Sequence, residues 1–143
     1  MERALKIMEN SQQEIDLALL ATLRLLYVED ADFARESLAY YLKRYFGKVD
    51  VAGDGKKGLA LFQAHPYDLV LTDISMPVMD GLEMTRQIKA IKPDMPVIVI
   101  SAHSEEAMRQ DAAAAGVADF LIKPLFPEQV KAAIYHCIMK HRQ

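Results

Sequence analysis

The chain has 143 residues, 52% of them hydrophobic and 26% charged, so it can bury the core of one globular domain. Its formal net charge of −3 gives no broad positive surface, which argues against direct nucleic-acid binding and makes proteins the expected partners. No apolar stretch is long enough to cross a membrane, no secretory signal is recognisable, and the single cysteine, Cys137, cannot form an internal disulfide. We therefore expect a cytoplasmic protein in which Cys137 is a core or interface residue.

Residues 1–21 precede the first predicted strand and are expected to form a helical extension or linker, with the domain proper at residues 22–143. A three- and four-residue spacing with one polar member runs through this segment at Leu5, Met8, Gln12, Ile15 and Leu19. Fewer than three heptads leave two interpretations open. The segment is either a helix packed on its own domain or a coiled coil that dimerises or relays a signal.

Five short apolar runs follow, alternating with segments of helical periodicity. Several runs are almost continuously hydrophobic, which is typical of strands covered on both faces. The strands are predicted at residues 23–28, 49–52, 69–72, 97–100 and 120–122. Regular strand–helix alternation predicts an α/β fold, a doubly wound five-stranded parallel sheet with helices on both faces.

The helices between these strands are marked by apolar stripes and by turn residues such as Gly47 and Gly116 at the joins. The stripes of the first four helices are Leu38, Tyr41, Leu42 and Tyr45; Leu59 and Phe62; Met84, Ile88 and Ile91; and Met108, Ala112 and Ala115. A fifth helix ends near His141. In sheets of this kind ligands bind at the carboxyl ends of the strands, where the strand order reverses.

Acidic residues stand at two of these strand ends. Glu29 and Asp30 follow the first strand, and Asp73 follows the third. Three converging carboxylates repel one another unless a cation binds between them, and oxygen ligands suit Mg²⁺ or Mn²⁺. The polarity of loops would by itself explain Glu29 and Asp30, but the residues at the other strand ends favour a site.

The fourth and fifth strands end in groups that can bind a phosphoryl oxygen. Ser101 supplies a hydroxyl after the fourth strand, and Lys123 supplies an ammonium group after the fifth. A carboxylate nucleophile, a metal, a hydroxyl and an ammonium are the parts that phosphoryl transfer needs, because stabilising charge on the transferring group dominates that chemistry. The sequence therefore predicts that Asp73 accepts a phosphoryl group.

From about residue 22 to residue 141, the chain resembles the receiver domains of response regulators in bacterial two-component signalling. The matching motifs, in chain order, are Glu29-Asp30, the stretch from Asp73 through Met76-Pro77 to Met79-Asp80-Gly81, Ser101-Ala102, and Phe120-Leu121-Ile122-Lys123-Pro124. Each motif is weak alone, but in this order, each at a strand end, they are highly specific. The resemblance implies the flavodoxin-like fold of chemotaxis-type receivers.

The resemblance also implies a role for each site residue. Asp73 would take a phosphoryl group from a phosphohistidine on a sensor histidine kinase or phosphotransfer protein. Asp30, Asp73 and the backbone carbonyl of Ser75 would ligate Mg²⁺, while Glu29 would act largely through bound water. Lys123 would contact the phosphoryl group.

A conformational switch is implied as well. Ser101 would move toward the acyl phosphate and Phe120 would rotate inward, so that the fourth helix, fifth strand and fifth helix present a face to a partner or a second copy. The family often has Thr and Tyr at these two positions, and an aromatic ring without a hydroxyl should bury more readily. Ser75 and His103 would tune the phosphoryl lifetime, although an ordinary exposed loop histidine is the default for His103.

The segment after the fifth strand departs from the family pattern at one position. The peptide bond before Pro124 is expected to be cis, as is common in the family. Phe126 stands where a small polar helix cap would be expected, and we expect it in the core rather than on a partner-binding face. The remaining histidines show no ligand spacing and are interpreted as structural; they are His65, His136 and His141.

Three other functions fit the sequence less well. Haloacid-dehalogenase-like phosphatases carry a second Asp two residues after the nucleophile, where this chain has Ser75. In a flavodoxin-like FMN carrier, Glu29-Asp30 would repel the phosphate, and a receiver-like scaffold that is never phosphorylated would not need the complete acidic site. We expect a signalling acceptor with intrinsic phosphotransfer and autodephosphorylation activity, either stand-alone or part of a larger regulator or hybrid kinase.

Overall fold

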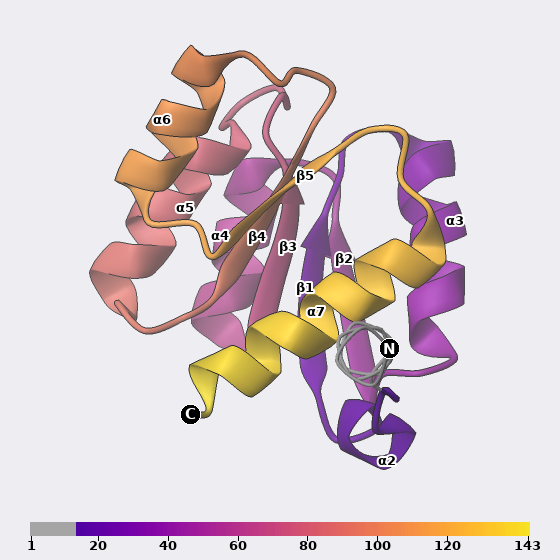
Figure 1. The fold of residues 1–143 in the computed structure, drawn as a ribbon. Helices are drawn as coiled ribbons and strands as arrows, with labels where there is room; N and C mark the ends of the chain where they lie inside the picture. Colours follow the sequence, from indigo (N-terminus) through magenta and orange to yellow (C-terminus); the bar gives the residue numbers. More distant parts are fainter. Residues whose placement is uncertain (1–13) are drawn as a thin grey trace, which may run out of the picture.

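The computed structural model describes residues 14–143 of the chain (Figure 1). Five parallel strands form one sheet in the order β2-β1-β3-β4-β5. The strands are β1 (Arg24–Val28), β2 (Lys48–Ala52), β3 (Leu69–Asp73), β4 (Val97–Ser101) and β5 (Asp119–Ile122). The predicted sheet is confirmed, and every predicted strand boundary agrees with the structure to within about one residue.

Helices cover both faces of the sheet (Figure 1). The described helices are α2 (Leu17–Leu20), α3 (Asp32–Lys43), α4 (Gly55–Ala64), α5 (Gly81–Ile91), α6 (Glu106–Ala115) and α7 (Pro127–His141). One face packs against α2, α3 and α7, and the other packs against α4, α5 and α6. The doubly wound fold predicted from strand–helix alternation is thus confirmed.

Alternating side chains of the central strands pack into two hydrophobic cores, one on each face of the sheet. On β1, Leu25 and Tyr27 join the core beneath α3 and α7, while Leu26 and Val28 join the core beneath α4 and α5. All five residues of β3 and of β4 are buried, because both strands are internal and covered on both sides. Each fully buried aliphatic side chain contributes roughly 1.5–3 kcal/mol relative to exposure. Cys137 is partly buried against the first of these cores, in agreement with its prediction.

The helices begin and end where the local sequence satisfies their free backbone groups. Asp54 accepts a hydrogen bond from the Lys57 amide, and Asp80 accepts one from the Glu83 amide, each at 2.8 Å, so that α4 and α5 are capped by aspartate. Gly116 ends α6 in the left-handed conformation, with φ of 90°. The two aspartate caps fix loops at the carboxyl edge of the sheet, whereas Gly116 turns the chain into the start of β5 at the opposite edge.

One prediction of a core position is wrong, and one residue of a predicted apolar stripe is exposed. Phe126 is 58% exposed, because it lies in extended backbone at the start of α7 while the preceding residue, Leu125, packs against the core instead. Ile91 is 53% exposed, since it is the last residue of α5 and extends past the end of the buried stripe formed by Met84 and Ile88.

The N-terminal prediction is described only from residue 14 onward. Leu5, Met8 and Gln12 lie outside the described residues, so the coiled coil and the boundary at residue 22 stay predictions. The backbone is extended at Asp16, which caps the short helix α2 through the amide of Leu19 at 3.1 Å. Leu20 of this helix is fully buried in the core. Within residues 14–143, no helix is long and apolar enough to cross a membrane.

Candidate functional site

Three carboxylates meet at the carboxyl ends of β1 and β3. Glu29, Asp30 and Asp73 each offer an oxygen, and these atoms lie within 4.8 Å of one another. Val28 pairs with Thr72 in the parallel register of β1 and β3, so the residues that follow them, Glu29 and Asp73, lie side by side. Glu29 and Asp73 are buried, whereas Asp30 is exposed. The cluster lies between β1 and β3, where the strand order reverses.

Lys123 brings a positive charge to this cluster from the segment after β5. Its Nζ lies 3.1 Å from Oδ2 of Asp73, to which it donates a hydrogen bond, and 3.6 Å from Oε1 of Glu29. Burial lowers the pKa of Lys123, but the hydrogen bond and the two carboxylate charges outweigh burial, so its pKa is raised overall and it stays protonated. The Lys123–Pro124 peptide bond is cis, as predicted.

The surroundings of Glu29 disfavour its charged form. Burial, together with the neighbouring Asp73 carboxylate, raises the pKa of Glu29 to about 7, although the charge of Lys123 opposes the shift. Its Oε2 is buried and has no hydrogen-bond partner within the described part of the chain. A buried carboxylate oxygen without a partner, beside two further carboxylates, is a donor set that fits a hard divalent cation.

Ser101 ends β4 on the strand next to Asp73. Asp73 pairs with Ile100, so Ser101 lies one position further along, where it is buried. Its Oγ accepts a hydrogen bond from the His103 amide at 3.0 Å. The His103 side chain is 58% exposed and its Nδ1 lies 3.6 Å from Glu105 Oε1, as expected for an ordinary loop histidine at the rim of the site.

The loop from β3 to α5 passes tightly over Asp73. Ser75 is exposed immediately after buried Ile74, and the Gly81 amide donates a hydrogen bond to the Ile74 carbonyl at 2.8 Å. A Cβ atom at Gly81 would lie 2.1 Å from the carbonyl oxygen of Asp73. Only glycine permits this approach, which closes the loop against Asp73.

Phe120 lies apart from the carboxylate cluster, half-buried on β5. The guanidinium carbon of Arg109, on α6, lies 5.0 Å from the centroid of its ring. This arrangement is a cation–π contact that sequence spacing could not reveal, because a helix and a loop separate the two residues.

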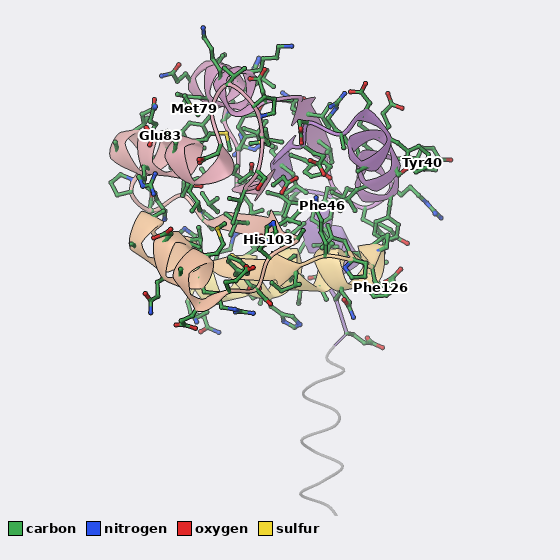
Figure 2. All side chains as sticks on the ribbon, turned by 90° about the horizontal axis from the view of Figure 1, so that it is seen from above. Tyr40, Phe46, Met79, Glu83, His103 and Phe126 are labelled. Carbon is green, nitrogen blue, oxygen red and sulfur yellow. The ribbon has the colours of Figure 1, made fainter. Side chains whose placement is uncertain are left out.

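A groove of about 320 Å³ runs from the cluster between α3 and the segment after β5. Glu29 and Lys123 of the cluster line it, together with the apolar residues Tyr27, Leu38 and Leu125. Figure 2 shows exposed Phe126 and Tyr40 on this side of the molecule, whereas Met79 and Glu83 lie on the opposite side. The groove thus opens toward a surface that carries exposed aromatic side chains.

The structure therefore brings together Glu29, Asp30, Asp73 and Lys123, with Ser101 on the adjoining strand end. One residue at the cluster was missed from the sequence. Arg35 donates a hydrogen bond from Nη1 to the backbone carbonyl of Glu29 at 2.8 Å. The sequence did offer a signal for this contact, because Arg35 stands in the first turns of the helix that follows Glu29-Asp30. The histidines outside this site are exposed and join no metal-ligating cluster in residues 14–143; they are His65, His136 and His141.

Comparison with known proteins decides the family. The family model of the response regulator receiver domain matches residues 25–135. The chain belongs to the response-regulator receiver family. This receiver domain is 38% identical over 112 residues to the chemotaxis protein CheY of Bacillus subtilis (strain 168), covering 78% of this chain and 93% of CheY.

The same receiver domain also matches parts of longer regulators. It is 37% identical over 107 residues to the transcriptional regulatory protein ResD of Bacillus subtilis (strain 168), covering 75% of this chain but 44% of ResD. The chain thus spans less than half the length of that relative. Among solved structures, the CheX–CheY–BeF₃–Mg²⁺ complex of Borrelia burgdorferi matches with a TM-score of 0.74 and 30% identity, covering 78% of this chain and 86% of that chain. Receiver domains of this family are signalling components of two-component systems.

Proposed function

We propose that Asp73 of this receiver domain accepts a phosphoryl group from a phosphohistidine of a sensor histidine kinase or phosphotransfer protein in the cytoplasm. The observation that carries this proposal is the burial of Asp73, 5% exposed, between the ammonium of Lys123 and the carboxylate of Glu29. Buried acidic side chains are rare, and a buried carboxylate with one fixed cation at a strand-order reversal is arranged for chemistry.

The donor set supports Mg²⁺ or Mn²⁺ as the cofactor. Asp30, Asp73 and the backbone carbonyl of Ser75 would hold the ion, with Glu29 acting largely through water. The cation would supply charge stabilisation to the transferring phosphoryl group. The partnerless Oε2 of Glu29 and the three converging carboxylates support this assignment.

The transfer itself uses side chains of this chain as follows. A carboxylate oxygen of Asp73 attacks phosphorus, an O–P bond forms, and the P–N bond to the donor imidazole breaks with its electron pair remaining on nitrogen. Lys123 then donates to a phosphoryl oxygen, having been held 3.1 Å from Asp73 beforehand. The hydroxyl of Ser101 donates to a second phosphoryl oxygen.

Phosphorylation then shifts a conformational equilibrium. As Ser101 moves toward the acyl phosphate, Phe120 rotates inward and the face formed by α6, β5 and α7 repacks. That face binds an output partner or a second copy of the chain. Dimerisation through the N-terminal segment, residues 1–21, is the alternative, and residues 1–13 of that segment lie outside the described part of the chain.

The phosphoryl donor is proposed to dock at the groove beside α3. Glu29 and Lys123 line this groove, and Lys123 lies 3.1 Å from Asp73, so a donor side chain bound there would lie close to the acceptor. Exposed Phe126 offers an apolar contact beside the groove, which accounts for an aromatic residue at a helix start that it does not cap. Ser75 and His103, at the rim of the site, tune how long the phosphoryl group survives.

Beryllofluoride, which mimics an acyl phosphate, tests this function. In the presence of Mg²⁺ we expect it to shift the amide resonances of β5 and α6 in the wild-type protein and to leave Asp73→Asn unchanged. Wild-type spectra that do not respond would contradict the proposal and favour an unphosphorylated scaffold. Sustained hydrolysis of p-nitrophenyl phosphate at enzyme-like rates would contradict it in favour of a phosphatase.

A further inference from the structure

The side chain of Arg35 links the backbone of Glu29, just after β1, to Asp32 at the start of α3. Nη1 donates to the backbone carbonyl of Glu29 at 2.8 Å, and Nη2 donates to Oδ1 of Asp32 at 2.7 Å. The side chain is 18% exposed, so its guanidinium is largely withdrawn from water. Two acceptors in fixed positions use the planar geometry that guanidinium provides and an ammonium group does not.

The carbonyl that Arg35 binds belongs to the peptide that joins Glu29 to Asp30. In the preceding peptide, the Glu29 amide donates to the carbonyl of Ala52 at 3.0 Å, so both backbone polar groups of Glu29 are hydrogen-bonded just after β1 ends. Gly53 lies beside the guanidinium, since a Cβ atom there would lie 3.5 Å from Nη1 of Arg35. The Arg35 contact therefore helps to fix the backbone from which both acidic side chains project.

Arg35 also brings positive charge to a crowded acidic site. Lys123 pairs with Glu29 and Asp73, but within the described residues it forms no ion pair with the exposed Asp30. The Arg35–Asp32 ion pair and the bond to the Glu29 carbonyl instead fix the loop that carries Asp30. Groups that orient metal ligands without binding the metal typically change metal affinity by roughly 10–100-fold when removed.

We propose that Arg35 is a positioning residue for the divalent cation site, acting through the peptide between Glu29 and Asp30. This inference rests on the proposed function, because it assumes that these acidic residues hold Mg²⁺. The measurement that tests it is the Mg²⁺ dissociation constant of the full chain, obtained by isothermal titration calorimetry at pH 8 for the wild type, Arg35→Met and Arg35→Lys.

Arg24→Met is the matched control. Arg24 binds both carboxylate oxygens of Asp68, through Nε at 3.1 Å and Nη2 at 3.3 Å, at the opposite end of β1. Its loss removes an Arg–Asp pair from the same strand without touching the acidic cluster. Thermal denaturation in EDTA reports the structural cost of each substitution separately from metal affinity.

We expect Arg35→Met to raise the Mg²⁺ dissociation constant roughly tenfold or more, and Arg35→Lys to raise it severalfold because lysine cannot hold both acceptors. Arg24→Met should lower thermal stability and leave the dissociation constant within about twofold. Unchanged affinity in both Arg35 variants, or equal weakening in Arg24→Met, overturns the inference while leaving the proposed function intact. A wild-type protein that does not bind Mg²⁺ overturns the metal site itself and the inference with it.

Discussion

At the scale of single residues, the site combines groups that would destabilise the fold if they stood alone. Glu29 and Asp73 are buried carboxylates, and Lys123 compensates only part of their charge. Burying a charge without full pairing is costly, so such groups persist where chemistry or a bound ion uses them. The residue-scale predictions follow from this imbalance and from the packing of Phe120.

Glu29 should make the stability of the metal-free protein depend on pH. Its pKa is about 7 in the fold, against an ordinary value of 4.5, so the native state holds a proton that the unfolded state releases. The stability contributed by this proton is fully present below about pH 4.5 and is lost as pH rises through 7. Glu29→Gln cannot lose a proton, so its stability relative to wild type should increase from pH 5 to pH 8.

Urea denaturation in EDTA at several pH values measures this difference. Subtracting the two curves removes the other titrating groups, such as Asp68, whose pKa is lowered by its bonds to Arg24 against the effect of burial. Stability curves for wild type and Glu29→Gln that run parallel between pH 5 and pH 8 would show that Glu29 is not protonated in the fold.

Arg109 should favour the outward position of Phe120. Its guanidinium carbon lies 5.0 Å from the ring centroid, a contact worth about 0.5–1 kcal/mol at an exposed site. Arg109→Gln removes this contact, so inward rotation becomes easier and the affinity for beryllofluoride with Mg²⁺ should rise about two- to fivefold. Arg86→Gln, which removes an exposed Arg–Glu pair on α5, is the control and should leave that affinity unchanged. Equal affinities in wild type and Arg109→Gln would contradict this role.

At the scale of elements, short-range contacts fix how the helices meet the sheet. The start of α5 touches the end of β3 at Gly81, and α7 meets α3 through a nearly buried lysine, Lys131. The first contact shapes the loop over Asp73. The second holds one of the helices of the proposed output face, which also includes α6 and β5.

Gly81→Ala should destabilise the protein and displace Asp73. The new Cβ atom would lie 2.1 Å from the Asp73 carbonyl oxygen, and relieving such overlap costs about 1–3 kcal/mol. Gly53→Ala is the control, since its nearest contact is the end of a side chain at 3.5 Å and its stability should change by less than about 1 kcal/mol. Equal unfolding free energies of the two variants in urea would refute the close approach at Gly81.

Lys131→Gln should weaken the packing of α7 on α3. The Nζ atom lies 5.7 Å from the ring centroid of Tyr41 on α3, 3.9 Å from that of Tyr45 just after α3, and 3.1 Å from Oε2 of Glu128. Because Lys131 is only 7% exposed, its cation–π contact is desolvated, and we expect a loss of about 1–2 kcal/mol of unfolding free energy. Lys56→Gln, at an exposed position of α4, should change it by less than about 0.5 kcal/mol. The contact is unimportant if urea denaturation gives both variants the same stability.

At the scale of the whole molecule, the sequence predicts the sheet because β3 and β4 are covered on both faces and therefore read as unbroken apolar runs. The meeting of Glu29 with Asp73 also follows, since parallel strands place their carboxyl ends at one edge. The exposure of Phe126 and the contacts of Arg35 do not follow, because loop conformation and contacts between loops carry no periodic signal. The sequence around Phe126 shows that the residue is apolar, but it does not show the backbone conformation that leaves the side chain exposed.

The central claim is that Asp73 is the phosphoryl acceptor of this receiver domain. Intact-mass spectrometry after incubation with acetyl phosphate and Mg²⁺ tests it most directly, in wild type, Asp73→Asn and the control Asp54→Asn, in which asparagine can still cap α4. We predict that wild type and Asp54→Asn gain the mass of one phosphoryl group and that Asp73→Asn gains none. A phosphoryl mass gain in Asp73→Asn equal to that of wild type would contradict the account.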